Sequence, residues 1–221
     1  MGYGGTITDS YNTGAVSATG NSYVYVGGLV GRGDMVTITG SYNTGDVSAT
    51  GNSAVYAGGL VGYCNYSGTV TITDSYNTGA VSATGNSDVY VGGLVGYGGS
   101  AVTITDSYNT GAVSATGNFR VYVGGLVGYG ATVTITDSYN TGDVSASTTG
   151  NSYVYAGGLV GYGDTFTITD CYYTLPENSS NNYGEKKSSV AEIVAIIKEL
   201  WDSSVWDFDN LDENGNPILR Y

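Results

Sequence analysis

The chain contains no histidine, only 6 lysine and arginine residues and only 2 prolines among its 221 residues. Without histidine it lacks the side chain that most often serves as a general base or metal ligand near neutral pH. The few basic residues face 19 acidic ones, which gives a net charge of −13. Because phosphate binding needs clustered lysine and arginine, this composition argues against nucleic acid as a partner. It also opposes adsorption to an anionic membrane.

Long apolar runs and a cysteine framework are also missing. No run approaches the roughly 20 residues that cross a bilayer, so we expect no membrane insertion. The chain opens inside a repeat unit and shows no signal-peptide pattern, so we interpret it as a segment of a longer array. Cys64 and Cys171 fall in different repeats. Stacked strands rise ~4.8 Å each, which separates these two residues too far for a disulfide. We expect two free structural thiols, and neither residue predicts a cofactor.

Glycine and tyrosine are abundant instead, at 37 and 22 residues. A glycine content this high raises the question of disorder, but 41% hydrophobic residues can bury a core. Two segments repeat along the chain. Thr6–Gly14 recurs from Thr37, Thr71, Thr103, Thr134 and partly Thr167, and Val24–Gly31 recurs from Val55, Val89, Val121 and Val154. Internal repeats of this length are typical of stacked architectures.

The copies show which side chains face inward. The position of Tyr23 becomes Asp88 and Arg120 in other copies, so it faces solvent, whereas the next position is always valine. Alternation with period 2 then places Val24 and Val26 in the core and turns Tyr25 outward. By the same parity, Val36 and Ile38 face inward while Thr37 and Thr39 face outward.

One such unit has no partner for its apolar face, but units stacked in register pair every strand above and below. The sequence therefore predicts an all-β fold: a β-solenoid, or β-helix, of five to six coils of about 32 residues. The alternative is a set of successive hairpins in a sandwich or prism. That alternative explains less well why each position keeps its inside or outside parity in every copy.

After about residue 174 glycine becomes rare and the pattern changes, so we divide the chain into a solenoid (1–173) and a C-terminal cap (174–221). Ser189 and Glu192 form a capping box before an amphipathic helix at 189–201. We expect this helix to cover the open end of the last coil, with Trp206, Phe208, Leu211 and Ile218 completing the plug. The N-terminal coil has no such cap, so end-to-end self-association is expected there.

The Gly-Gly-Leu-Val-Gly segment combined with Thr-Ile-Thr-Asp-Ser-Tyr-Asn-Thr-Gly resembles the GLUG-repeat family. The match covers residues 3 to about 173, although the tail is shorter and the repeats are more uniform than in that family. GLUG repeats occur in bacterial surface proteins, including adhesin-like proteins and the non-catalytic parts of immunoglobulin-A-cleaving peptidases. The resemblance implies an extracellular or cell-surface location more firmly than any activity.

Two outward-facing arrays are candidate binding surfaces. The first is a threonine face that resembles the ice-binding face of some solenoid antifreeze proteins, although threonine is also simply a good outward strand residue. Its members are Thr37, Thr39, Thr71, Thr73, Thr103, Thr105, Thr134 and Thr136. The second is an aromatic column for packing against sugars or proteins, unless its rings mainly stack on one another. Its members are Tyr25, Tyr56, Tyr90, Tyr122 and Tyr155.

Catalysis and metal binding have little support in the sequence. The acids Asp9, Asp74, Asp106, Asp137 and Asp170 repeat with the coils and are better explained by turn hydrogen bonds than by one active site. Asp207, Asp209 and Asp212 only loosely resemble a calcium loop, and because their spacing does not fit the standard loop, an acidic surface turn explains them better. We therefore expect a non-enzymatic stalk or adhesive scaffold whose partner is a protein or glycan. The alternatives are an ice-binding protein, a carbohydrate-binding solenoid and, least supported, a carbohydrate-active enzyme.

Overall fold

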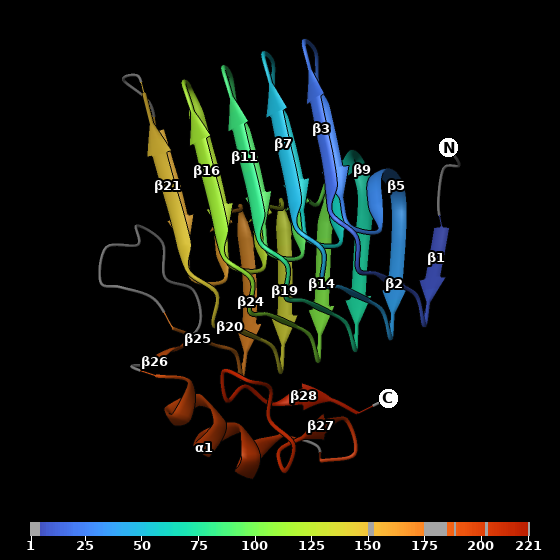
Figure 1. Cartoon of the computed structure of the whole chain (residues 1–221), viewed down its shortest axis with the longest axis vertical. Helices are drawn as coiled ribbons and strands as arrows, with labels where there is room; N and C mark the ends of the chain where they lie inside the picture. The colour runs from blue at the N-terminus through green and yellow to red at the C-terminus, as the bar shows by residue number, and fades with distance from the viewer. Residues whose placement is uncertain (1–4, 150–152, 175–184, 188, 202, 221) are drawn as a thin grey trace.

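Figure 1 shows a computed structural model of the chain, which describes residues 5–149, 153–174, 185–187, 189–201 and 203–220. The chain winds into coils whose strands stack in parallel, and one short helix lies near the C-terminus. The prediction of a β-solenoid is confirmed, and the hairpin alternative is wrong, because all strand pairs of the coils are parallel. None of the described helical residues forms a segment long and apolar enough to cross a membrane.

Each coil contributes strands to four sheets. The threonine sheet contains β1 (Gly5–Thr8), β5 (Val30–Thr39), β9 (Val61–Thr73), β13 (Val95–Tyr97), β14 (Ala101–Thr105), β18 (Val127–Tyr129), β19 (Thr132–Thr136), β23 (Val160–Tyr162) and β24 (Thr165–Thr169). The short-strand sheet contains β2 (Tyr11–Asn12), β6 (Tyr42–Asn43), β10 (Tyr76–Asn77), β15 (Tyr108–Asn109), β20 (Tyr139–Asn140), β25 (Tyr172–Thr174) and β26 (Glu185–Lys187).

The other two sheets enclose the upper part of each coil in Figure 1. The serine sheet contains β3 (Val16–Gly20), β7 (Val47–Gly51), β11 (Val81–Gly85), β16 (Val113–Gly117) and β21 (Val144–Thr148). The tyrosine sheet contains β4 (Val24–Gly27), β8 (Val55–Gly58), β12 (Val89–Gly92), β17 (Arg120–Gly124) and β22 (Tyr153–Gly157). Valine and alanine side chains from these two sheets fill the space between them.

The predicted alternation of inward and outward side chains is confirmed in the core. Val24 and Val26 are buried, as are Val36 and Ile38, whereas Thr37 between the latter two is exposed. Like residues face like residues in most core columns, because the register pairs valine with valine and isoleucine with isoleucine from coil to coil. A second core of leucine, valine and isoleucine side chains lies behind the threonine sheet.

A polar ladder of asparagines runs through the interior. Asn43, Asn77, Asn109 and Asn140 are fully buried. The Nδ2 group of Asn77 donates to the carbonyl oxygen of Gly79 at 2.7 Å and to Oδ1 of Asn109 at 2.8 Å. The pattern repeats in the other coils, so these buried amides satisfy one another. The repeated asparagine is thus explained by structure.

The repeated aspartates occupy left-handed turns. Asp9, Asp74, Asp106, Asp137 and Asp170 have φ angles between 47° and 50°, and Gly40 takes the same place in the second coil at 56°. Aspartate tolerates this backbone region better than most residues, and glycine does so freely. The interpretation of these acids as turn residues is therefore supported by their backbone.

The tail contains α1 (Val190–Leu200) and an antiparallel pair of short strands, β27 (Trp206–Asp207) and β28 (Ile218–Leu219). The hydroxyl of Ser189 accepts a hydrogen bond from the backbone N–H of Glu192, as the capping box predicts. The domain boundary between residues 173 and 174 stays a prediction, because residues 175–184 lie outside the described part of the chain.

The expected position of the tail is wrong. Figure 1 shows it beneath the coils, along the short-strand sheet, rather than across the end of the stack. Ile193, Ile197 and Trp206 pack against tyrosines of that sheet, while Leu211 is exposed and Ile218 is half-buried. The physical reason is that the stacked tyrosines of this sheet provide an apolar surface against which the apolar residues of the tail are buried. Among the described strands, β26 alone extends a sheet beyond the last coil, by pairing with β25.

Candidate functional site

The predicted threonine face is assembled as two straight files on the threonine sheet. One file joins Thr6, Thr37, Thr71, Thr103, Thr134 and Thr167, and the other joins Thr8, Thr39, Thr73, Thr105, Thr136 and Thr169. Neighbours are spaced ~4.8 Å along a file and ~6.7 Å across the files. Within the files no charged side chain interrupts the array.

A third, less regular file lies beside these two. It contains Met35, Thr69, Ala101, Thr132 and Thr165. Sequence reasoning missed it, because methionine and alanine break the threonine pattern in two coils. Threonine has a restricted χ1 angle and displays one methyl and one hydroxyl group. The face therefore presents an ordered, uncharged mixture of apolar and hydrogen-bonding groups.

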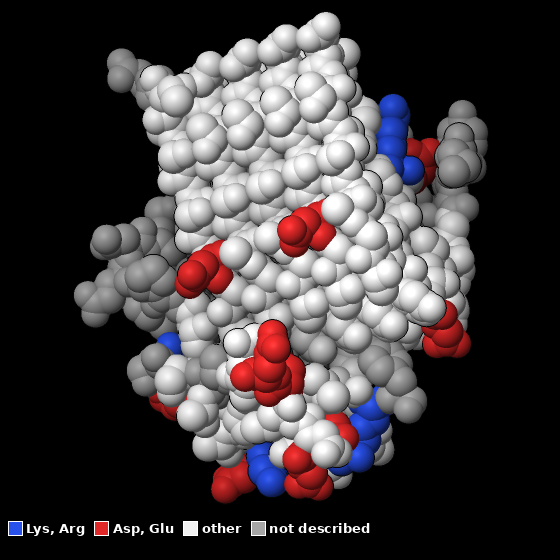
Figure 2. Space-filling model, viewed as in Figure 1, with Lys and Arg blue, Asp and Glu red and all other residues white. Residues whose placement is uncertain are grey.

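A second flat array, which the sequence analysis did not single out, lies on the serine sheet. Its outward files are Ser17, Ser48, Ser82, Ser114 and Ser145, and Thr19, Thr50, Thr84, Thr116 and Ser147. Figure 2 shows this face as a flat grid of small side chains with few charges. The sequence carries a signal for this array: the position of Ala15 becomes Asp46 and Asp143 in other coils, which indicates that it faces outward, and Ser17 and Thr19 share its parity.

The aromatic column on the tyrosine sheet is stacked and covered. Ring centroids of successive tyrosines, from Tyr25 to Tyr155, lie 5.1, 4.9, 4.8 and 5.0 Å apart. A second file packs over the column, for example with Tyr63 edge-on to Tyr56 at 4.9 Å. Its members are Tyr63, Tyr97, Tyr129 and Tyr162. Tyr56, Tyr90 and Tyr122 are consequently only 6–8% exposed.

This packing limits what the column can bind. The ring faces are used by neighbouring rings, whereas stacking on a sugar needs an open ring face. Burial also raises the pKa of Tyr56 and Tyr90 well above the ordinary value of a phenol. The alternative in which the rings stabilise the sheet fits this geometry. The second file was visible in the sequence as a tyrosine after most Gly-Leu-Val-Gly segments.

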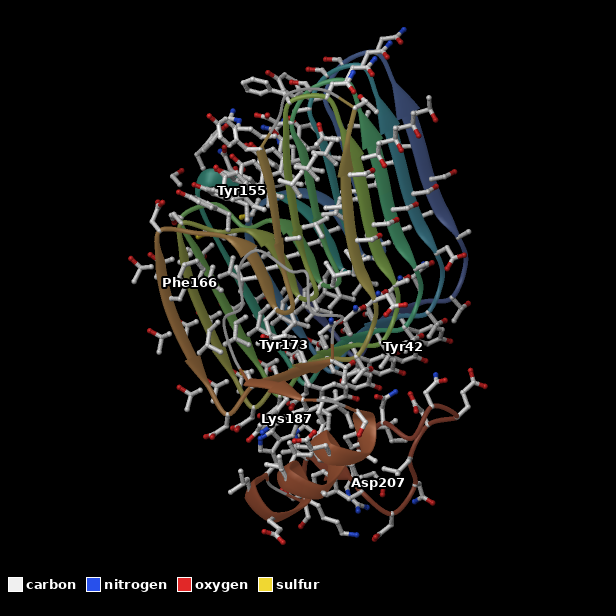
Figure 3. The ribbon with its side chains drawn as sticks, turned by 90° about the vertical axis from the view of Figure 1, so that its left-hand side faces the viewer. Tyr42, Tyr155, Phe166, Tyr173, Lys187 and Asp207 are labelled. Carbon is white, nitrogen blue, oxygen red and sulfur yellow. The ribbon has the colours of Figure 1, made fainter. Side chains whose placement is uncertain are left out.

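A third tyrosine array, the lateral ladder, lies on the short-strand sheet and consists of Tyr11, Tyr42, Tyr76, Tyr108, Tyr139 and Tyr172. From Tyr11 to Tyr139 successive centroids lie 4.8–5.1 Å apart, with planes within 7° of parallel. The rings therefore turn their edges and hydroxyls sideways. Figure 3 places Tyr42 at the rim beside the tail, and Tyr155 of the aromatic column on the opposite flank.

The tail packs against the lateral ladder from Tyr76 to Tyr172. The indole of Trp206 lies 5.8 Å from the ring of Tyr108 and 5.7 Å from that of Tyr139. Its Nε1–H donates to the carboxylate of Asp106 at 3.3 Å, and the Tyr139 hydroxyl donates to the carbonyl of Pro217 at 2.6 Å. Tyr108 and Tyr139 are buried, whereas Tyr11 at the other end is 64% exposed.

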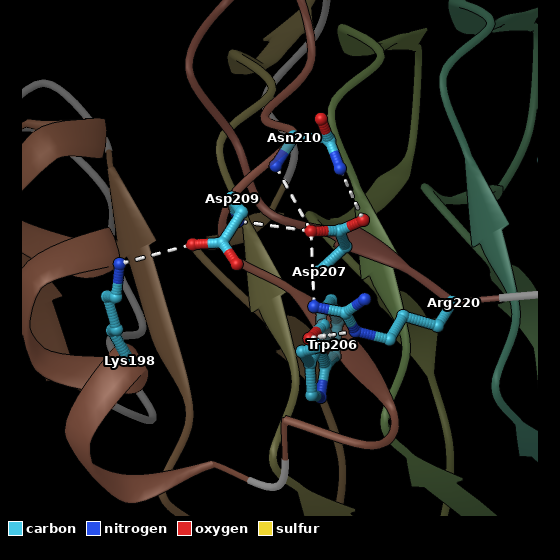
Figure 4. A network of polar contacts seen from close by, with 6 residues as sticks. All are labelled: Lys198, Trp206, Asp207, Asp209, Asn210 and Arg220. Atoms are coloured by element: carbon cyan, nitrogen blue, oxygen red, sulfur yellow. Dashed lines mark hydrogen bonds and ion pairs between the residues drawn. The ribbon is translucent and has the colours of Figure 1, made fainter.

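The acidic segment of the tail is a set of turns. The Asp207 carboxylate accepts bonds from the N–H groups of Asp209 and Asn210 and from the Asn210 amide, and pairs with Arg220 at 3.3 Å (Figure 4). These interactions lower the pKa of Asp207. The hydrogen bond from the Asn210 side-chain amide has the largest effect, and the backbone N–H groups and the charge of Arg220 add to it. Asp212 accepts from Asn214 and Asn216 in the same way. This geometry fits the acidic surface turn rather than the calcium loop.

Other reactive groups are sparse in the described residues. Cys64 and Cys171 are free and buried, as predicted. Burial raises the pKa of the Cys64 thiol to about 11 and that of Cys171 to about 12, so both stay protonated near neutral pH. Within the described part of the chain no three acidic or thiol groups gather in a metal-binding cluster.

Comparisons with known proteins agree with this architecture. The GLUG motif matches residues 120–145, which span β17 and the threonine and serine sheets of the next coil. The resemblance to GLUG repeats is thus confirmed. A crystal structure from Bacteroides ovatus, described as a "putative immunoglobulin A1 protease", is similar with a TM-score of 0.61 at 20% identity. The alignment covers 98% of this chain and 76% of that one, and it shows the fold alone. No curated protein matches the chain.

Proposed function

We propose that this GLUG-repeat module is a non-enzymatic stalk or adhesive scaffold of a bacterial surface or secreted protein. The observation that carries the proposal is that the lateral faces repeat nearly the same residues in the same register from coil to coil. A face that repeats every ~4.8 Å suits a spacer or a multivalent contact surface, because each coil adds the same groups. Its partner is a protein or glycan outside the cell.

The absence of catalysis is part of this proposal. An active site needs different groups brought together once, with perturbed proton affinities in a cleft. Five of the described aspartates instead follow the coils in one column of left-handed turns. Both thiols are buried, and each donates its proton to a backbone carbonyl, that of Asp34 for Cys64 and that of Thr169 for Cys171.

Incubation with candidate substrates and ligands tests the proposal. We expect the purified chain to leave immunoglobulin A1 and a panel of bacterial and host polysaccharides intact over many hours. In the same samples we expect retention of one or more of these macromolecules on the immobilised chain, if the scaffold is adhesive. Cleavage of any of them that a fully denatured sample lacks would contradict the non-enzymatic assignment.

A second function, ice binding, is favoured by one observation. The threonine files stay in register over all six coils without a charged or bulky member. Flat arrays of methyl and hydroxyl groups suit an ordered water lattice. A double Thr71→Lys/Thr103→Lys variant should abolish thermal hysteresis, whereas Thr84→Lys/Thr116→Lys on the serine sheet should retain it. Absence of hysteresis in the unmodified chain at high concentration would remove this function.

A further inference from the structure

The second tyrosine file, which packs over the aromatic column, begins with an arginine. Arg32 of β5 pairs in register with the first tyrosine of the file, and the same position holds, coil by coil, Tyr63, Tyr97, Tyr129 and Tyr162. The Cζ atom of Arg32 lies over two rings, 5.4 Å from the centroid of Tyr25 and 5.6 Å from that of Tyr63. Both distances suit a cation–π contact, so the charged group is held on an aromatic support.

The charge of Arg32 is not neutralised by an ion pair. The other two arginines each pair with an aspartate, Arg120 with Asp88 at 2.6 Å and Arg220 with Asp207 at 3.3 Å. Within the described part of the chain Arg32 makes no such pair, and it is exposed. The planar donors of a guanidinium match the two oxygens of a carboxylate, so Arg32 is available to an external anion of that kind.

Exposed tyrosines lie near this guanidinium. Tyr23 is 59% exposed and stacks on Tyr25 with ring centroids 6.3 Å apart, and Tyr66 is 70% exposed. Burial raises the pKa values of Tyr25 and Tyr63. The Tyr66 phenol adds to this rise and the charge of Arg32 opposes it, so both groups lie near those hydroxyls. Unlike the covered rings of the aromatic column, Tyr23 and Tyr66 leave ring surface open for a ligand.

We infer that Arg32, Tyr23 and Tyr66 form a binding site for a sugar that carries a carboxylate, such as a uronic acid residue. The guanidinium would bind the carboxylate through paired N–H donors, and the open rings would pack against the apolar face of the sugar. A polyanion or a strongly acidic peptide fits less well, because the net charge of −13 repels it. The inference rests on the proposed scaffold function and deepens it by naming the class of glycan that is held.

Short oligosaccharides of galacturonic acid are the probe, and their methyl esters are the matched uncharged ligands. Isothermal titration calorimetry on the full chain measures both affinities. We expect saturable binding of the acid that weakens as salt is added, because exposed charges are screened. The methyl ester keeps the ring but loses the charge, so it should bind at least about tenfold more weakly, which corresponds to about 1.4 kcal/mol.

Two variants change the charge of the site. Arg32→Tyr installs the residue that later coils carry at this position, so the fold should survive. Binding of the acid should nevertheless fall at least about tenfold. Asp34→Asn removes an acidic group two residues from Arg32 on β5, so it should tighten binding of the acid.

A matched pair of variants tests the aromatic contact. Tyr23→Ala should weaken binding of the acid, because it removes an open ring beside the unpaired arginine. Tyr153→Ala is the control and should bind normally. Tyr153 is 67% exposed and also lies beside an arginine, Arg120, but Asp88 neutralises that charge.

Three results would overturn the inference. They are the absence of saturable binding by the acid, equal affinity for the acid and its methyl ester, and binding that Arg32→Tyr and Tyr23→Ala leave unchanged. Each of them would leave the scaffold proposal standing. Cleavage of the oligosaccharide by the native chain would instead refute the scaffold proposal itself, so the two failures are distinguishable.

Discussion

Replacing Asn109 by alanine should destabilise the solenoid strongly. Asn109 is fully buried, and its Nδ2 group donates to the Gly111 carbonyl at 2.7 Å and to Asn140 Oδ1 at 2.8 Å. Its own Oδ1 accepts from Asn77 at 2.8 Å. The substitution leaves three buried partners short of a bond. At about 1–3 kcal/mol for each of these three groups, the free energy of unfolding should fall by about 3–9 kcal/mol.

Asn12→Ala is the matched control, because Asn12 is the first member of the same ladder. Its Nδ2 group makes the equivalent bonds, to Gly14 at 2.6 Å and to Asn43 at 2.7 Å. Asn12 is half-buried at the edge of the first coil, so water can replace what is lost. The expected loss of stability is about 1 kcal/mol.

Urea unfolding followed by circular dichroism measures both changes. Repeat arrays can lose two-state behaviour, which would change the m-value of unfolding. The free energies of the two variants are therefore compared only if their m-values are similar. If the losses in unfolding free energy of the two variants differ by less than about 1 kcal/mol, the reasoning is refuted. A buried asparagine in the middle of the ladder should cost more to remove than a water-accessible one at its end.

Three further outcomes are expected. Alkaline pH should unfold the chain cooperatively. Burial raises the pKa of many tyrosines in the folded chain, and that of Tyr76 to about 12. The stability that these neutral side chains contribute is therefore complete below pH ~10, the pKa of an unfolded tyrosine, and is lost as pH rises through the folded pKa. Absorbance at the phenolate band, recorded with circular dichroism, checks whether ionisation and unfolding coincide. Cys64 and Cys171 should react with a thiol reagent only after unfolding, and rapid labelling of the native chain would contradict their burial. Gly125→Ala should be severely destabilising in thermal melts, since the added Cβ would lie 2.0 Å from a backbone carbonyl oxygen of the next coil, whereas Gly5→Ala meets open space.

The solenoid could be predicted from the sequence because its copies act as an internal alignment. Charged residues such as Asp88 and Arg120 at one repeat position show that this position faces solvent, and the alternation along the strand then assigns the inward positions. Coils stacked in register place equivalent inward residues on one another. The threonine files followed directly, since the same parity assigns every member.

The packing outside the coils could not be predicted in the same way. Strand parity turns Tyr25 outward, but it does not predict that Tyr63 of β9, in the next coil, packs against the Tyr25 ring. The tail shows the same limit. The apolar pattern of residues 190–201 predicts a buried helix face, whereas the choice between the coil end and the lateral ladder depends on three-dimensional contacts such as that of Trp206 with Asp106.

The central claim is that the chain is a stack of like coils that resists tension as a scaffold. Single-molecule force spectroscopy between the two ends tests it most directly. Equivalent ladder positions are 31–34 residues apart, so each coil that opens should release about 110 Å at ~3.4 Å per residue. The account predicts extension steps in whole multiples of that length. Steps without a common unit, or a smooth extension at negligible force, would contradict it.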